Sequence, residues 1–329
     1  MDKQYDCVKL CFYTPLHLSR GREQYDQGAT TLHSDTVMAA LFSAACQLGA
    51  EPNEALSMLE ACRISSAFPF HREEYFFPKP MAKMIFNLND VVEEKQGKPY
   101  KKIRYLGKRW FEKLLNGEPE AIQSKTHLAN PAFLTDKLTN ENKVFKTEVV
   151  QRVAIAPDHS EDPKPFYTER LYFGEQSGLF ILVEWLDTSA RELFQRAFRL
   201  LGDLGIGTDR SVGNGFFTPS FESLVLRLPD KPTKQCNLGL YLPDRSELNS
   251  TLLEESAWNL VKRGGYLAGA AQIEHFTLRK KSVYMFEVGS VFPNVPLQGK
   301  RVDLKPDWQG LNHPVWREGR PIFVPFFGN

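Results

Sequence analysis

With 329 residues, of which 42% are hydrophobic and 25% charged, the chain has the composition of a globular protein and room for two ordinary domains, which excludes global disorder. Its formal net charge of +1 means that attraction to a polyanion must come from local patches and not from the charge of the whole molecule. Five cysteines without a CxxC pair, a start without a signal-peptide pattern and no run of roughly 20 apolar residues indicate a cytoplasmic protein without membrane contact.

The first elements of the chain read as a strand followed by two helices. Apolar residues alternate from Val8 to Phe12, and this period of two predicts a strand. After a polar loop, we expect Ser34 to cap a helix that Gly49 ends. A second helix over 53–63 leads into a strand over 64–70.

Residues 95–113 form the most basic stretch of the chain. They hold eight Lys or Arg against one Glu, a local net charge of +7, and aromatic residues lie between the cations. Cations of this kind meet phosphates, and aromatic rings stack on bases or on a protein partner. Lys101, Lys102 and Arg104 are therefore candidate contacts to RNA or to a partner. The alternative is a solvated face without a binding role.

The region after this block predicts extended structure. A strand over 145–156 places Lys146 and Arg152 on one face. Strands over 171–173 and 179–185 predict a long hairpin, because only a short glycine-bounded segment separates them. Hairpins of this type serve as projecting fingers in nucleic-acid-binding proteins, although an ordinary hairpin is the alternative.

Residues 201–217, which we call the glycine loop, are the most distinctive stretch. The loop follows a helix that begins at a predicted capping box, Ser189 with Glu192, and it leads into an aromatic run. It contains glycines at 202, 205, 207, 213 and 215. Such density indicates positive φ angles or close approach of a ligand to the main chain. No Gly-Lys-Ser or Gly-Lys-Thr triplet is present, which argues against a P-loop nucleoside triphosphatase.

The polar residues of the glycine loop favour phosphate binding. Thr208, Arg210, Ser211 and Asn214 supply hydroxyl, guanidinium and amide donors between the glycines. We therefore expect the loop to lie along an extended polyanion. A Cβ at Gly207 or Gly213 should then obstruct binding while the fold stays near normal, apart from a local penalty of about 1 to 3 kcal/mol if the native φ is positive. The alternative is a flexible structural loop.

The last third of the chain predicts a smaller α+β unit. Prolines 229 and 232 mark a seam after a strand over 221–228. Beyond it we expect a strand over 238–242, a helix over 252–261, a strand over 280–288 and a hairpin over 316–326. The sequence therefore predicts α+β domains with antiparallel sheets, divided as 1–220 and 221–329.

Several of these strings resemble one family. The helix followed by GDLGIGTDRSVGNGFF is similar to the glycine-rich loop of the RAMP superfamily of CRISPR proteins. LHSD, QRVAI, RGGY, VYMFEVGSVF, GKRVDLKP and HPVWREGRPIFVPF, in this order, make nearly the whole chain similar to the fourth subunits of type III-A (Csm) effector complexes. The basic stretch over 95–113 matches no pattern of the family.

The resemblance implies a fold and a function in antiviral defense. It implies two ferredoxin-like, RRM-like domains with a β-hairpin thumb. It also implies a non-catalytic RNA-binding subunit, without cofactor or metal, that holds the 5′ handle of the crRNA and docks the large polymerase/nuclease subunit and the first backbone RAMP subunit. The RNA-binding positions that it implies are Arg20, His33, Ser34, Arg152, Gly205, Gly207, Thr208, Arg210, Ser211, Gly213 and Gly215.

Two other functions stay open at this point. Some RAMP relatives are endoribonucleases that process precursor crRNA with a histidine as general base, and His17 and His33 lie near the start of the first helix. Asp35 occupies a stretch comparable to that of an essential Asp in the slicing subunit, but a cap and helix-dipole role explains it more simply. The third possibility is a protein scaffold, which RNA copurification separates from an RNA-binding subunit.

Overall fold

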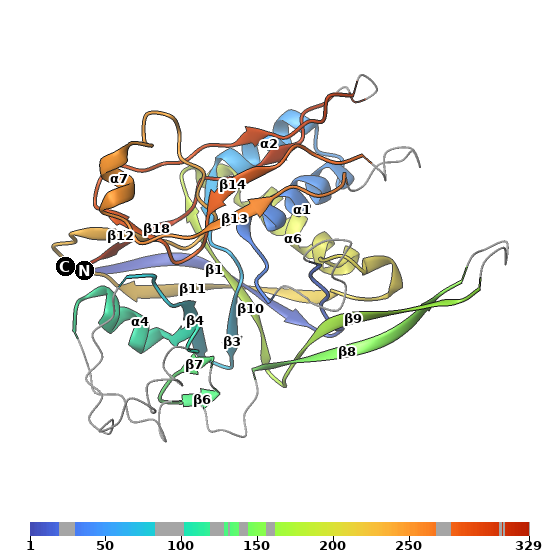
Figure 1. The fold of residues 1–329 in the computed structure, drawn as a ribbon, viewed down its shortest axis with the longest axis horizontal. Helices are drawn as coiled ribbons and strands as arrows, with labels where there is room; N and C mark the ends of the chain where they lie inside the picture. The colour runs from blue at the N-terminus through green and yellow to red at the C-terminus, as the bar shows by residue number, and fades with distance from the viewer. Residues whose placement is uncertain are drawn as a thin grey trace.

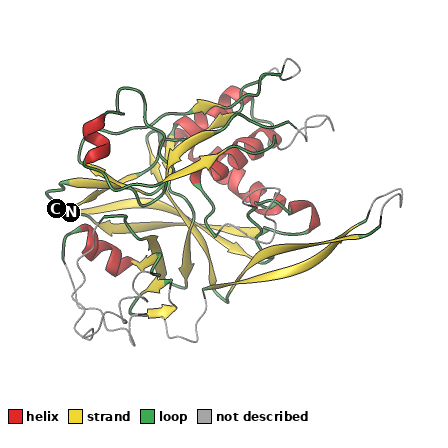
Figure 2. Cartoon of the chain, in the orientation of Figure 1, coloured by secondary structure: helices red, strands yellow, loops and turns green. Residues whose placement is uncertain are grey.

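The computed structural model describes residues 1–19, 30–82, 102–118, 128–130, 132–137, 144–155, 162–267, 278–308, 311 and 313–328. The fold is mixed α+β, with sheets that are antiparallel apart from one parallel pair of strands, β5 and β7 (Figures 1 and 2). No helix in these ranges is long and apolar enough to cross a membrane. The predicted α+β class with antiparallel sheets is confirmed.

The centre of the molecule is one large sheet with the strand order β11-β1-β10-β3-β4-β5-β7-β6, and β2 also pairs with β10. Its strands are β1 (Asp2–Phe12), β2 (Cys62–Ile64), β3 (Phe68–His71), β4 (Glu74–Pro78), β5 (Tyr105–Gly107), β6 (Leu128–Asn130), β7 (Phe133–Leu134), β10 (Ser177–Trp185) and β11 (Phe217–Arg227). β1 lies between β10 and β11, with Val8 opposite Ile181 and Phe221. The alternation along β1 sends Val8 and Leu10 to one face and Tyr5 and Cys7 to the other.

Three helices contribute to the core on the Val8 face of this sheet: α1 (Ser34–Gln47), α2 (Pro52–Glu60) and α6 (Arg191–Leu204), the last preceded by the 3-10 turn η2 (Thr188–Ala190). Two cap predictions are wrong. His33, not Ser34, is the N-cap of α1, and its side chain makes no cap bond. Ser189 lies in the turn before α6, where Asp187 accepts a hydrogen bond from its amide, so there is no capping box.

The Tyr5 face is covered by α4 (Lys108–Leu115) and by the last third of the chain. Trp110 and Phe111 of α4 are 3% and 0% exposed, and Phe111 stacks on Phe77 with ring centroids 4.5 Å apart. Tyr105 is buried as well. The predicted binding role of these aromatic rings is wrong, because they lie in the hydrophobic core. Residues 95–101 of the basic stretch, Lys101 included, fall outside the described ranges.

A long hairpin projects from the body of the molecule (Figure 1). It consists of β8 (Phe145–Ala154) and β9 (Lys164–Phe173), paired without interruption from Phe145 opposite Phe173 to Ala154 opposite Lys164. The predicted hairpin over 171–185 is wrong in its partners. β10 pairs instead with β1, β2 and β3 of the central sheet, because its nearly continuous apolar sequence suits a strand with both faces buried.

The last third of the chain forms small sheets beside the large one. Its elements are β12 (Lys234–Asn237), α7 (Ser250–Glu254), β13 (Leu260–Arg263), β14 (Val283–Phe286), β15 (Val291–Pro293), β16 (Val302–Asp303), β17 (Trp316–Arg317) and β18 (Phe323–Phe326). The predicted hairpin over 316–326 is wrong, since β17 pairs with β16 and β18 pairs with β12. The strand predicted over 238–242 lies earlier, at β12. The domain boundary at 220/221 stays a prediction, and β11 continues through it to Arg227.

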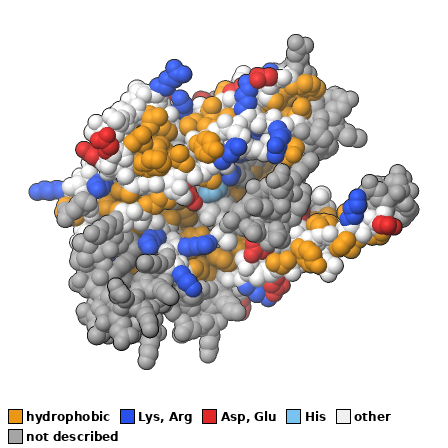
Figure 3. Space-filling view, in the orientation of Figure 1, with side chains coloured by type: hydrophobic (Ala, Val, Ile, Leu, Met, Phe, Trp, Pro, Cys, Tyr) orange, Lys and Arg blue, Asp and Glu red, His pale blue; other side chains and the backbone are white. Residues whose placement is uncertain are grey.

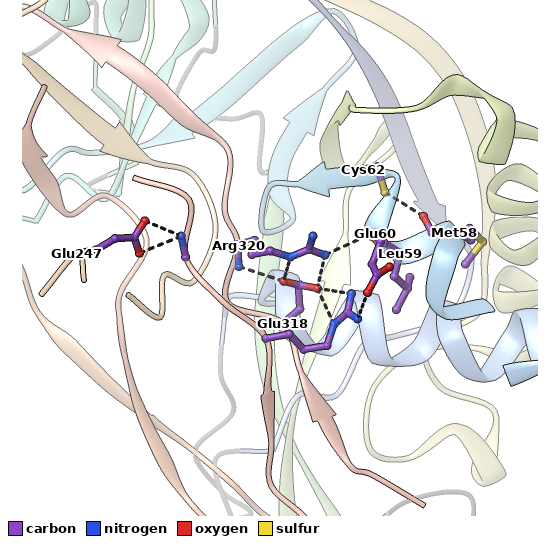
Figure 4. A network of polar contacts seen from close by, with 9 residues as sticks. Met58, Leu59, Glu60, Cys62, Glu247, Glu318 and Arg320 are labelled. Carbon is purple, nitrogen blue, oxygen red and sulfur yellow. Dashed lines mark hydrogen bonds and ion pairs between the residues drawn. The ribbon is translucent and has the colours of Figure 1, made fainter. Parts of the chain in front are cut away.

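Glu318, at the centre of the predicted hairpin, is a buried carboxylate that holds two arginines. Arg320 Nε donates to Glu318 Oε1 at 2.7 Å, and Arg301 Nη2 donates to Glu318 Oε2 at 3.1 Å (Figure 4). Arg301 Nη1 reaches Glu60 Oε1 of α2 at 3.1 Å, and Arg320 Nη2 reaches the Leu59 carbonyl at 3.3 Å. This network joins the end of the chain to α2.

Candidate nucleic-acid interface

A basic groove of about 1430 Å³ lies where the glycine loop, the start of α1 and the last third of the chain meet. Its cationic lining residues are Lys79, Arg104, Arg210, Lys262, Arg263, Lys280, Arg301 and Arg317, against the acids Asp35, Glu287 and Glu318. On the face over β13 and β14, separate Lys and Arg side chains lie among apolar ones (Figure 3). The groove therefore concentrates positive charge in a molecule whose total charge is nearly zero.

The glycine loop owes its shape to contacts within the protein. Gly205, Gly207, Gly213 and Gly215 have φ angles of 74°, 106°, 84° and 79°, the positive values that the glycine density predicted. The amide of Gly215 donates to the Pro15 carbonyl at 2.7 Å, and the amide of Ile206 donates to the Gly215 carbonyl at 2.9 Å. A Cβ on Gly215 would collide with the Ile206 carbonyl. These glycines allow close packing of the main chain on itself.

The tip of the loop is the part that is open to a ligand. Thr208, Arg210, Ser211 and Gly213 are exposed, and the 3-10 turn η3 (Arg210–Val212) forms the outermost part. A Cβ on Gly213 meets no atom within 4 Å among the described residues. Thr208 and Arg210 line the groove together with Gly205 and Gly207. The loop thus presents hydroxyl and guanidinium groups to the groove.

The start of α1 forms one wall of the groove through His33. Burial lowers the pKa of His33 to about 4, and the charge of Arg263 lowers it further than Asp35 raises it. The imidazole is therefore neutral at pH 7, and its buried Nδ1 has no hydrogen-bond partner among the described residues. Ser34 has a structural role instead. Its buried Oγ accepts from the Leu240 amide at 3.0 Å, and its own amide donates to Ser66 Oγ at 3.0 Å.

A buried ion cluster lies next to His33. Asp35, whose side chain is 0% exposed, accepts hydrogen bonds from Arg263 Nε at 2.9 Å and Nη2 at 3.0 Å, and its Oδ2 lies 3.1 Å from Arg317 Nη1. Burial alone raises the pKa of Asp35, but the two guanidinium groups outweigh burial and lower the pKa to about 2. The predicted cap role is wrong, since His33 is the N-cap, whereas Asp35 does lie in the first turn of α1, where a negative charge favours the helix dipole. Its carboxylate holds these two arginines.

The remaining predicted residues lie in different places. Arg104 lines the groove. Arg152 of the hairpin contacts the glycine loop, with Nη1 3.3 Å from Asp209 Oδ2, and Lys102 is exposed away from the groove lining. Arg20, like Lys101, falls outside the described residues.

Sequence reasoning assigned no binding role to Arg263, Lys280 and Arg317, which the fold brings to the groove from distant segments. Arg263 and Arg317 lie in the strings RGGY and HPVWREGRP, which indicated the family resemblance but no particular binding residue. Lys280 had no signal of this kind.

The comparisons with known proteins agree along the whole chain. Residues 12–218 match the RAMP superfamily, and residues 230–326 match the CRISPR Csm4 C-terminal domain. A protein named CRISPR system Cms protein Csm4 from Mycobacterium tuberculosis is 28% identical over 88% of each chain. A protein of the same name from Streptococcus thermophilus is 26% identical over 96% of this chain and 97% of the relative.

Solved structures share the fold. A chain in the crystal structure of a Csm1-Csm4 cassette in complex with cA4 matches with a TM-score of 0.64 and 19% identity, over 99% of this chain and 100% of the other. A chain in a Csm3-Csm4 subcomplex of the type III-A CRISPR-Cas interference complex matches with a TM-score of 0.64 and 17% identity, over the same shares.

Proposed function

The chain belongs to the RAMP superfamily of CRISPR proteins, and from this premise we propose that it is the fourth subunit of a type III-A (Csm) effector complex and holds the 5′ handle of the crRNA. The observation that carries the RNA-binding part is the basic groove. Eight Lys or Arg side chains line it against three acids, and the exposed tip of the glycine loop borders it. Single-stranded RNA is held by a positive groove for its phosphates and by short donors that reach the 2′-OH.

The partners follow from the relatives. Csm4 proteins have been solved together with Csm1 and with Csm3, and their chains share the fold of this one. We therefore assign to this chain the docking of the large polymerase/nuclease subunit and of the first backbone RAMP subunit. We place this assembly in the cytoplasm, the compartment that the free cysteines favour.

A ferredoxin-like unit is part of the proposal. With α2 and the segment from β3 to β9 taken as insertions, β1, α1, β2, β10, α6 and β11 give the order β-α-β-β-α-β, with the spatial strand order β11-β1-β10-β2. This order favours a boundary after β11, which ends at Arg227, a few residues beyond the predicted 220/221. The β8–β9 hairpin, inserted before β10, is the proposed thumb, and its Arg152 lies against the glycine loop.

The geometry argues against the endoribonuclease alternative. His17 is 1% exposed, and its Nδ1 lies 2.6 Å from the Glu169 carbonyl oxygen, so a substrate 2′-OH has no access to this ring. The low pKa of His33 makes it a weak base at neutral pH. We infer a binding role for the groove and no catalytic step.

Coexpression with the neighbouring genes tests the proposal. The tagged chain should purify in one complex with a short RNA of uniform 5′ end. Arg210→Ala at the loop tip should weaken retention of that RNA, because it removes a charge-assisted contact worth about 1.5 to 3 kcal/mol. Arg245→Ala, an exposed arginine away from the groove, is the matched control and should change nothing. A complex that assembles fully without RNA would make the chain a protein scaffold.

A further inference from the structure

The ion cluster around Asp35 contains more positive than negative charge. Arg263 and Arg317 contact Asp35 directly. Lys280 lines the same groove, close enough for the charges of all three residues to shift its pKa. Three cations therefore face one carboxylate, which leaves a local charge of +2. Among the described residues, Lys280 has no ion-pair partner of its own.

Two features indicate that the described residues do not neutralise this surplus. Arg317 is 7% exposed, and its buried Nε has no hydrogen-bond partner among the described residues. Burial lowers the pKa of Lys280 to about 8, and the positive charges of Arg317 and Arg263 add to this effect against the opposing charge of Asp35. A half-buried cation next to other cations is unfavourable unless an anion joins them.

The backbone holds Lys280 firmly at this place. Its amide donates to the Gly265 carbonyl at 2.9 Å, in the extension of the β13–β14 hairpin that carries Arg263. The Arg317 Nη2 atom lies 3.3 Å from the Gly264 carbonyl oxygen. The three cations thus come from two segments that are fixed to each other, which is the preorganisation that an anion site needs.

We propose that Lys280, Arg263 and Arg317 form a phosphate-binding subsite, in which Asp35 orients the two arginines and Lys280 contacts one backbone phosphate of the RNA in the groove. This inference rests on the proposed function and specifies it. The subsite and the tip of the glycine loop line the same groove, so that both are available to one RNA backbone. The ligand class is a phosphodiester of single-stranded RNA.

The test compares two adjacent lysines in the full chain, with a fluorescently labelled single-stranded repeat RNA as the probe. Lys280→Met removes the proposed contact and keeps the side-chain length. Lys281→Met is the matched control, because Lys281 is exposed and pairs with Asp307 at 2.6 Å. We expect Lys280→Met to bind about tenfold more weakly and to lower the salt dependence of log K by about 0.7, the value for one phosphate on a single strand. Lys281→Met should behave as the wild type.

A pH series gives a second readout that does not depend on the variant's stability. The charged groups that face Lys280 are Asp35 of α1, Arg263 of β13 and Arg317 of β17, and the neighbouring His33 is neutral at pH 7. Wild-type affinity should fall as the pH rises through about 8, where Lys280 loses its proton. Lys281→Met should keep this decline, and Lys280→Met should lose it.

The outcomes separate the two proposals. If the wild type binds the RNA and both variants bind it equally well, the cluster is only structural and the subsite is overturned, while the proposed function stands. If the wild type does not bind RNA, both fail. Thermal stabilisation by inorganic phosphate or ATP that Lys280→Met abolishes, with RNA affinity unchanged, would assign the subsite to a free phosphate compound and overturn the RNA assignment.

Discussion

The position that a Cβ would take on Gly207 lies 2.5 Å from the carbonyl oxygen of His17, so the glycine loop fits against the segment that follows β1 without space for a side chain. The same carbonyl accepts a hydrogen bond from the Thr208 amide at 3.0 Å. The expectation that a side chain at Gly207 leaves the fold near normal is therefore wrong. At Gly213, where a Cβ meets no described atom within 4 Å, the positive φ is what opposes a substitution.

Gly207→Val should destabilise the protein strongly. The positive φ alone costs about 1 to 3 kcal/mol, and the collision with the His17 carbonyl adds to it. Gly213→Asn is the control, since Asn tolerates a positive φ and its side chain points into open space. Urea denaturation should show a large loss for Gly207→Val and a small one for Gly213→Asn. Equal stability of the two variants would contradict the packing described here.

Asp35→Asn should cost about 3 to 5 kcal/mol, because it leaves the buried Arg317 and the partly buried Arg263 without a counter-charge. The control is Asp307→Asn, which removes an exposed carboxylate whose ion pair contributes about 0 to 1 kcal/mol. The free energies of unfolding in urea at neutral pH measure both. A loss at Asp35 no larger than that at Asp307 would contradict the role of the cluster.

The ionisation of Asp35 should make the stability of the protein depend on pH. The pKa of Asp35 is lowered to about 2 in the folded protein, so its contribution to stability is complete above its ordinary pKa of 3.8 and is lost as the pH falls toward 2. The stability difference between the wild type and Asp35→Asn should therefore shrink over this interval. Measuring this difference cancels the titration of the other carboxylates, which both proteins share.

Local patterns predicted much of the fold, but not the partners of distant segments. The alternation along β1, the apolar face of α1 and the positive φ of the glycines follow from neighbouring residues, and all are present. The pairing of β10 with β1 and not with β9 depends on the whole sheet, and no local signal specifies it. For the same reason the sequence did not predict that Arg263 and Arg317 approach Asp35, because the three residues lie in distant segments of the chain.

Phe111→Ala should lower stability and not simply binding. Phe111 is 0% exposed and stacks on Phe77, and truncation of a buried Phe costs about 3 to 5 kcal/mol. Tyr284→Ala is a matched aromatic control, since Tyr284 is 60% exposed and its truncation should stay within about 0.5 kcal/mol. Thermal unfolding checks both. A stable Phe111→Ala variant that fails to bind RNA or a partner subunit would restore the binding role of this ring.

Two cations of the basic stretch, Arg104 and Lys102, should differ in their contribution to RNA binding. Arg104 lines the groove, whereas Lys102 is exposed outside its lining. Arg104→Glu should weaken RNA binding and flatten its salt dependence by about 0.7 or more, because the cation is replaced by a repelling charge. Lys102→Glu should change neither quantity if only the groove binds RNA. An equal effect of both changes would point to a contact along the whole stretch, and no effect of either would leave a solvated face.

The isolated chain should not cleave RNA. A general base must reach the 2′-OH in its unprotonated form with a pKa near the working pH. His17 is buried against the Glu169 carbonyl, and His33 has a pKa near 4, so neither meets both conditions. Repeat RNA incubated with the chain, with and without Mg²⁺, should therefore stay intact on a denaturing gel, and His33→Ala should change RNA affinity alone. Site-specific cutting that disappears in His33→Ala or His17→Ala would identify the chain as a processing nuclease, because a contaminating nuclease would survive either substitution.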